Sequence, residues 1–137
     1  MSSFTKSGSC IKRVFSSYYC KRQNAVKMEK KEFDKGQVAG LNASIGYGEG
    51  AIVSRTILNK ETGSVTLFSF DKGQSLSEHT APFDALVQVL DGSAVIVLDK
   101  KPIEVKENEM IIMPANIPHA VEAENRFKML LTMIRSK

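Results

Sequence analysis

The sequence predicts an all-β fold, a small sandwich or barrel, and two observations support this prediction. After Met28, short segments rich in Val, Ile, Thr and Phe recur at regular intervals, with turn residues between them. This rhythm is typical of antiparallel all-β domains. No helix of ordinary length is needed between Met28 and the C-terminus. A chain of 137 residues is the right size for one domain with its own hydrophobic core.

The expected strands follow the apolar runs, and most are bounded by recognisable turns. They are predicted at residues 37–45, 51–58, 64–71, 83–90, 93–98, 103–105, 110–113, 119–123 and 127–134. Asp91-Gly92 predicts a tight hairpin, because both residue types tolerate positive φ. Pro102 is expected to set the turn that starts at Asp99. Both faces of the last strand are largely apolar, so we expect it to lie between the core and a second buried interface.

The first 27 residues differ in composition from the rest. They contain six Lys or Arg and no acidic residue, whereas residues 28–137 contain thirteen basic and fifteen acidic residues. The net charge of +4 therefore comes from the N-terminal segment, and the remainder is near −2. This balance argues against nucleic acid as a partner of the folded part. No apolar run reaches the roughly 20 residues of a membrane-spanning helix, so we expect no membrane partner either.

Residues 1–27 are expected to form a presequence that is helical or disordered. Apolar residues recur there at helical spacing, namely Ile11, Val14, Phe15, Tyr18 and Tyr19. A basic, Ser-rich amphipathic segment of this kind is typical of a transit peptide for a mitochondrion or a related organelle. We expect cleavage between Arg22 and Lys27. The alternatives are a disordered basic tail, or Met28 as the true start of a cytoplasmic protein.

Two segments contain the only histidines of the chain. The first extends from Gly73 to Gly92 and includes His79, and the second extends from Met113 to His119. They resemble the two motifs of the cupins, G(X)5HXH(X)3–4E(X)6G and G(X)5PXG(X)2H(X)3N. The resemblance covers most of residues 28–137. It implies a single jelly-roll barrel, also called a double-stranded β-helix, with both histidines directed into one cavity.

Several motif positions are occupied by other residue types. Ala81 replaces the second His of the first motif, and Ala85 replaces its Glu. In the second motif Asn108 and Asn116 replace the two glycines, and Ala123 replaces the final Asn. The resemblance therefore implies the framework of the barrel together with a metal motif that has lost about half of its ligands.

The remaining donors suit weak metal binding through His79 and His119. Sites for Mn, Fe, Ni, Cu or Zn usually take three or four N/O ligands, and here two imidazoles remain. Strand alternation places Asp84 and Gln88 on the outer face of their strand, and Glu78 is also expected to point outward. We therefore expect one divalent ion, bound weakly, or none.

The functional hypothesis is a cupin that binds a small molecule of unassigned identity in the barrel cavity. We expect His79, His119, Met113 and Phe83 to line this cavity. The alternative is a metal-dependent enzyme, a dioxygenase or isomerase, acting on a small polar substrate. There the two imidazoles would hold the ion or act as base and acid. A third hypothesis is an interaction module in which each histidine only hydrogen-bonds the backbone.

The remaining Met and Phe residues allow several interpretations. They could line a pocket, fill the core or cover a dimer face, and they are Met110, Met113, Met129, Met133, Phe68, Phe70 and Phe83. We favour the core or a dimer face. The resemblance also implies a homodimer, because small cupins often pair through their sheets and so cover apolar strands and open edges.

Overall fold

The computed structural model describes residues 26–28 and 33–135 of the 137-residue chain. This described part contains the strands β1 (Val26–Met28), β2 (Ile52–Lys60), β3 (Gly63–Phe70), β4 (Ser75–His79), β5 (Ala85–Leu98), β6 (Lys101–Lys106), β7 (Met110–Met113), β8 (His119–Glu122) and β9 (Phe127–Ile134), and the 3-10 helix η1 (Asn42–Ser44). Of the expected presequence, residues 1–27, only Val26 and Lys27 belong to the described residues. No helix in the described ranges has the length and apolar character needed to cross a membrane.

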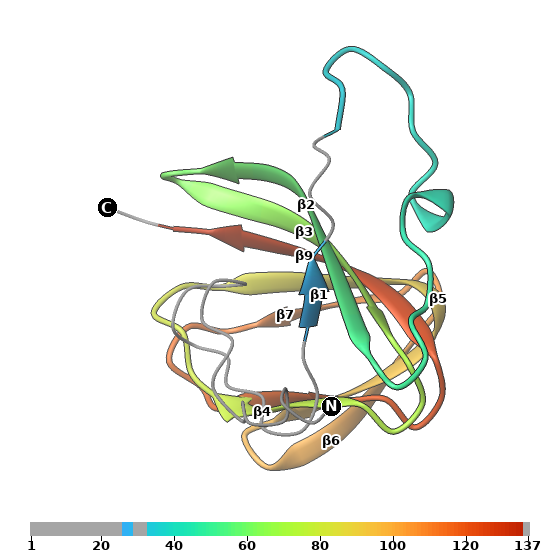
Figure 1. Ribbon diagram of the computed structural model, residues 1–137. Coiled ribbons are helices and arrows are strands. Elements are labelled where there is room, and N and C mark those ends of the chain that lie inside the picture. Colours follow the sequence, from blue (N-terminus) through green and yellow to red (C-terminus); the bar gives the residue numbers. More distant parts are fainter. Residues whose placement is uncertain (1–25, 29–32, 136–137) are drawn as a thin grey trace, which may run out of the picture.

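Two sheets share β5 and curl into a barrel, as Figure 1 shows. In one sheet the strand order is β1-β2-β3-β9-β5, with β7 on the other side of β5. In the other sheet β8 lies between β4 and β5, and β6 pairs with β5. All pairings are antiparallel except that of β1 with β2. The predicted all-β jelly-roll architecture is confirmed.

Strand β5 passes from one sheet into the other at Asp91-Gly92. Its first half pairs with β9 and β7, and its second half pairs with β6 and β8. The predicted hairpin at Asp91-Gly92 is therefore wrong, because the two halves pair with other strands and not with each other. The chain forms a bulge between Val89 and Asp91 instead. Gly92 has a φ of 76°, so the positive φ that favours a hairpin serves a bend here.

Three further expectations differ from the structure. Residues 37–45 form no strand but a loop with the helix η1, whose Ser44 N–H and hydroxyl donate to Leu41 O and Gly40 O. Strand β4 was not expected, because its sequence SLSEH contains a single strongly apolar residue. The turn after β5 is made by Asp99 and Lys100, both at positive φ, and Pro102 lies inside β6.

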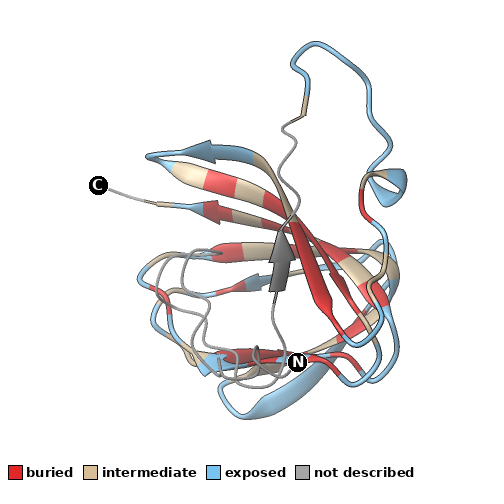
Figure 2. Cartoon of the chain, viewed as in Figure 1, coloured by how far each residue is buried: buried red, intermediate tan, exposed pale blue. Residues whose placement is uncertain are grey.

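The main core lies between the two sheets and follows strand alternation (Figure 2). Its inward methionines and phenylalanines include Met113, Met129, Met133, Phe68 and Phe70. The core interpretation of these five side chains is confirmed. A second cluster on the outer face of the β2-β3-β9 sheet joins Ile45, Val53 and Leu67 to partly buried Phe33, Ile57, Leu90 and Leu130.

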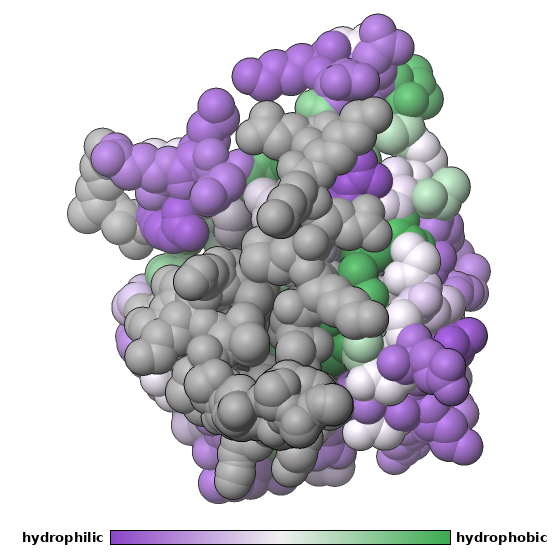
Figure 3. Space-filling model, viewed as in Figure 1, coloured by the Kyte–Doolittle hydropathy of each residue, from purple (hydrophilic) through white to green (hydrophobic). Residues whose placement is uncertain are grey.

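Tyr47 fastens the loop before β2 to the bend of β5. Its hydroxyl donates a 2.6 Å hydrogen bond to Asp91 Oδ2. Burial, and then the carboxylate of Asp91, raise the pKa of Tyr47 above its usual range. The guanidinium of Arg126 lies 4.7 Å from the Tyr47 ring, and its Nε donates to Asp71 Oδ1 at 2.9 Å. In Figure 3 the top of the view is largely hydrophilic, with a small hydrophobic group at its right, and the visible coloured residues at the bottom are also mostly hydrophilic.

Replacing Gly92 with Ala should destabilise the barrel. A Cβ at Gly92 would meet the carbonyl oxygen of Arg126 and the Cα of Phe127. The matched control is Gly36→Ala, because Gly36 also has positive φ (78°) but has no atom within 4 Å of such a Cβ. We expect about 1 kcal/mol of lost stability for Gly36→Ala, from backbone strain alone, and clearly more for Gly92→Ala. Urea unfolding measures both, and equal losses would contradict the proposed clash.

Candidate functional site

A one-residue bulge in β4 places His79 opposite His119. Leu76 of β4 pairs with Val121 of β8, and a regular ladder would then place Glu78 opposite His119. The register shifts between Leu76 and His79, so that His79 pairs with His119 instead. Because the side-chain period of a strand is two residues, this shift moves His79 to the inner face. The closeness of the two histidines that the cupin resemblance implied is confirmed.

The two imidazoles are in contact, and each is oriented by the backbone. Their ring centroids lie 4.4 Å apart, with an angle of 68° between the ring planes. His79 Nδ1 lies 2.7 Å from Ser77 O, and His119 Nδ1 lies 3.0 Å from Ile117 O. A carbonyl oxygen can only accept, so both Nδ1 atoms must carry the proton. In the neutral rings each Nε2 therefore carries the lone pair.

Hydrogen bonds between two loops hold His119 in position. The loop before His119 binds the loop after His79, since Asn116 N–H donates to Ala81 O at 2.7 Å. Ala115 N–H donates to Asp84 Oδ1 at 2.8 Å, and Asp99 N–H donates to Pro118 O at 2.8 Å. The loop before His119 is therefore held by backbone groups of Ala81 and Asp99 and by the carboxylate of Asp84.

The turn positions of both cupin motifs keep one backbone conformation. Gly73 and Gly92 have φ of 84° and 76°, and the two substituted positions, Asn108 and Asn116, have φ of 69° and 65°. Asn is among the few residues other than Gly that tolerate this left-handed region. The two Asn residues therefore keep the positive φ that these turns require.

Burial keeps both histidines neutral at pH 7. His119 is 4% exposed, and burial lowers its pKa below the usual value. The pKa of His79 is lowered to about 4, chiefly by burial; the hydrogen bond to Ser77 acts in the opposite direction, and the neighbouring His119 contributes a smaller lowering. The pair therefore presents uncharged acceptor nitrogens and no positive charge.

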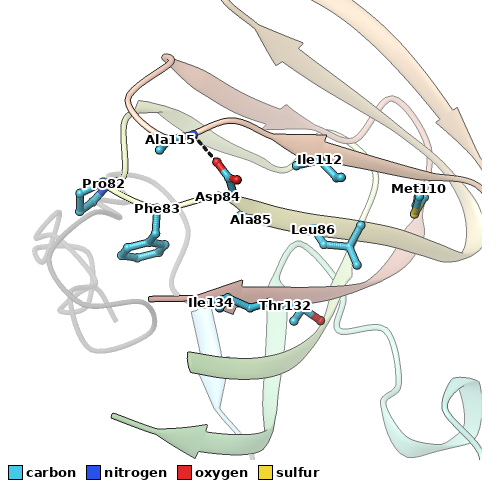
Figure 4. Close-up of a pocket in the computed structure, with 10 residues that line it drawn as sticks. All are labelled: Pro82, Phe83, Asp84, Ala85, Leu86, Met110, Ile112, Ala115, Thr132 and Ile134. Atoms are coloured by element: carbon cyan, nitrogen blue, oxygen red, sulfur yellow. Dashed lines mark hydrogen bonds between the residues drawn. The ribbon is translucent and has the colours of Figure 1, made fainter. Parts of the chain in front are cut away.

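Met113 is buried in the main core, and Phe83 packs against that core. Phe83 is half-buried and lines an apolar groove of about 620 Å³ on the outside of the barrel (Figure 4). Neither histidine lines this groove. The expectation that all four residues line one cavity remains a prediction.

The described residues supply too few donors for a firmly held metal ion. They contain no group of three or more His, Cys, Asp or Glu side chains placed to bind one. Glu78 turns outward, as expected, and its carboxylate lies 3.2 Å from Lys100 Nζ. Asp84 also faces outward and lines the groove. Two imidazoles alone fall short of the three or four ligands of a resident metal site.

Sequence reasoning missed the two carbonyl groups that orient the rings. Ser77 and Ile117 each lie two residues before a histidine, and their backbone oxygens accept from Nδ1. No side-chain pattern could have indicated them, because every residue has a carbonyl group. The bulge that brings His79 inward was missed as well.

The low pKa of His79 predicts a loss of stability in mild acid. An unfolded histidine binds a proton near pH 6.5, whereas folded His79 does so near pH 4. Between these values the unfolded chain binds more protons, so stability falls as pH falls through this window, by roughly 3 kcal/mol. Urea unfolding at several pH values measures this loss. His79→Gln serves as the control, because it removes the titrating group and leaves the carboxylates. An identical pH dependence in both proteins would contradict the assignment.

Comparisons with known proteins agree with this architecture. The family model for the cupin domain matches residues 66–134. A conserved Streptococcus pyogenes protein of unknown function is 35% identical, with a TM-score of 0.73 over 77% of this chain and 92% of that one. A cupin 2 conserved barrel domain protein from Leptotrichia buccalis is 49% identical, with a TM-score of 0.67 over 69% of this chain and 46% of that one.

A more distant structure shares the fold alone. The salicylate 1,2-dioxygenase of Pseudaminobacter salicylatoxidans is 15% identical, with a TM-score of 0.57 over 63% of this chain and 29% of that one. No curated protein matches the chain. The motif turns, the paired histidines and the family match over half of the sequence lead to one conclusion: this chain belongs to the cupin family.

Proposed function

We propose that this cupin binds a small polar molecule at the His79–His119 pair. The observation that carries the proposal is the contact between two neutral rings whose Nδ1 protons are held by backbone carbonyls. In both neutral rings the acceptor lone pair is on Nε2, and neutral rings offer an anion no charge. An uncharged ligand with O–H or N–H donors fits this chemistry better than a carboxylate or a phosphate.

A divalent ion would bind weakly at the same pair. Nε2 of His79 and of His119 could hold Mn, Fe, Ni, Cu or Zn, and water or the ligand itself would have to complete the coordination. With two protein ligands we expect such an ion to dissociate during gel filtration.

The alternative function is a metal-dependent dioxygenase or isomerase on a small polar substrate. It is favoured by the contact between two neutral imidazoles, since one Nε2 could take a proton from one atom of a substrate and return it to another atom of the same substrate. This function would require metal ligands beyond the described donor set.

We also propose that the chain forms a homodimer and that residues 1–27 direct it to a mitochondrion or related organelle. Strand β1 includes Val26 and Lys27 and pairs with β2, so cleavage before Val26 would retain this pairing. Fractionation of cells that express the tagged chain tests the localisation. Mass spectrometry of the mature N-terminus then tests the cleavage position.

Metal titration distinguishes the binding and enzyme hypotheses. The full chain, purified without chelator or histidine tag, is analysed by elemental mass spectrometry and then titrated with Zn²⁺ and Ni²⁺. We expect no stoichiometric metal after purification, weak binding on titration, and at least a tenfold loss of affinity in His79→Ala and in His119→Ala.

The matched control for this titration is Glu78→Ala, which removes the neighbouring outward carboxylate and should leave the affinity unchanged. Stoichiometric metal that survives gel filtration and disappears in both histidine variants would favour the enzyme. If wild type and the histidine variants bind metal and a panel of small polar molecules equally, the pair has no binding role. The interaction-module hypothesis would then be favoured.

A further inference from the structure

We propose that the groove beside β5 is a second binding site, for a small apolar molecule that carries one protonated amine. The site is separate from the proposed function, because neither His79 nor His119 lines the groove. The carboxylate of Asp84 recognises the amine, and the apolar walls hold the remainder of the molecule.

The groove lies on the outer face of three neighbouring strands. Leu86 of β5 pairs with Thr132 of β9 on one side and with Ile112 of β7 on the other. Paired residues in antiparallel strands lie on the same face, so these three side chains form the base of the groove. Figure 4 shows Phe83 at one end and Met110 at the other. The base is therefore held by strand pairing, which positions a binding site more firmly than a loop does.

The walls of the groove expose apolar surface. Ile112, Met110 and Ile134 are 54%, 62% and 70% exposed. They are three of the seven large hydrophobic side chains that are exposed in the described part of the chain. Exposed apolar side chains that gather in one place mark a binding surface, whereas scattered ones need no explanation.

The groove has the size of a small-molecule site. Its volume is about 620 Å³, and sites for small molecules typically measure ~300–1,000 Å³. Such sites combine apolar walls with a small number of polar groups that orient the ligand. Asp84 and Thr132 are the polar side chains among the ten that line this groove. The lining therefore fits a mainly apolar ligand with a single polar group.

Asp84 gives the groove its preference for positive charge. It is the one charged residue among those that line the groove. Its Oδ1 accepts the Ala115 N–H at 2.8 Å, which orients the carboxylate and leaves Oδ2 for a ligand. Neither of the two ion pairs found among the described residues includes Asp84. A protonated amine is attracted to this carboxylate, and an anion is repelled by it.

Arg135 approaches the Phe83 end of the groove but is bonded elsewhere. Its guanidinium lies 5.9 Å from the centroid of the Phe83 ring, and Arg135 does not line the groove. Nη1 of Arg135 donates to Lys60 O at 2.7 Å and to Glu61 O at 3.4 Å. The carboxylate of Asp84 is therefore the charged group that a ligand in the groove meets.

NMR titration of the isotope-labelled full chain tests the proposal with three compounds that share one apolar body. Phenylbutylamine, phenylbutanol and phenylbutyrate carry a positive charge, no charge and a negative charge at neutral pH. We expect the amine to bind about threefold more tightly than the alcohol, the ratio that an exposed ion pair supplies, and the acid to bind most weakly. The amide signals of Leu86 and Ala115 should shift on binding.

Asp84→Asn separates the charge of the groove from its shape. The amide oxygen of Asn can still accept the Ala115 N–H, so the variant loses the negative charge and keeps the hydrogen bond. We expect it to bind the three compounds with similar affinity. Glu78→Gln is the matched control, because it makes the same change at an outward carboxylate that does not line the groove. This control should keep the wild-type order.

Equal affinity of the three compounds for wild type, or an unchanged order in Asp84→Asn, would overturn the proposal. Absence of any shift at Leu86 and Ala115 would also overturn it, and is the result expected if a second copy or the N-terminal segment of the chain occupies the groove. If Asp84→Asn does not fold, the salt dependence of wild type replaces it. The preference for the amine must then disappear at ~1 M salt, where charges are screened beyond about 3 Å, and a preference that persists overturns the proposal.

Discussion

Strand β5 takes part in both sheets, and the rest of the barrel depends on its bend at Asp91-Gly92. Before the bend β5 pairs with β9 and β7, and after it with β8 and β6. A single strand thereby fixes the relative position of the two sheets that enclose the main core. The close approach of Gly92 to the backbone of Arg126 leaves no room for a side chain. Tyr47 reinforces the bend from outside through its hydrogen bond to Asp91.

The histidine pair is a consequence of this framework. Strand β8 pairs with the second half of β5, and β4 pairs with β8. His79 and His119 therefore lie opposite each other at the end of the β4–β8 ladder. The position of the rings is set by backbone groups, because Ser77 and Ile117 hold the Nδ1 protons. Burial then keeps both rings neutral. Ala81 and Ala85 occupy motif positions where the cupin resemblance implies metal ligands, and the proposed binding role follows from that difference.

The two faces of strand β9 have different surroundings. Met129, Leu131 and Met133 point into the main core, while Leu130, Thr132 and Ile134 face outward. The sequence predicted a second interface on this strand from its two apolar faces. In the structure Leu130 packs under the chain's own loop, and Thr132 and Ile134 line the groove. The inner face of β9 therefore belongs to the main core, and the end of its outer face lines the groove.

Local patterns in the sequence predict the all-β class, most strand positions, the residues that adopt positive φ and the place of each histidine in a cupin motif. These depend on local properties: alternation, turn chemistry and residues that tolerate positive φ. Tertiary structure decided that Asp91-Gly92 bends a strand instead of closing a hairpin, because both halves of β5 find partners elsewhere. It also decided that His79, and not Glu78, faces His119, because one extra residue in β4 reverses the alternation. Such a bulge depends on the ladder with β8, which is distant in sequence, and so local patterning does not encode it.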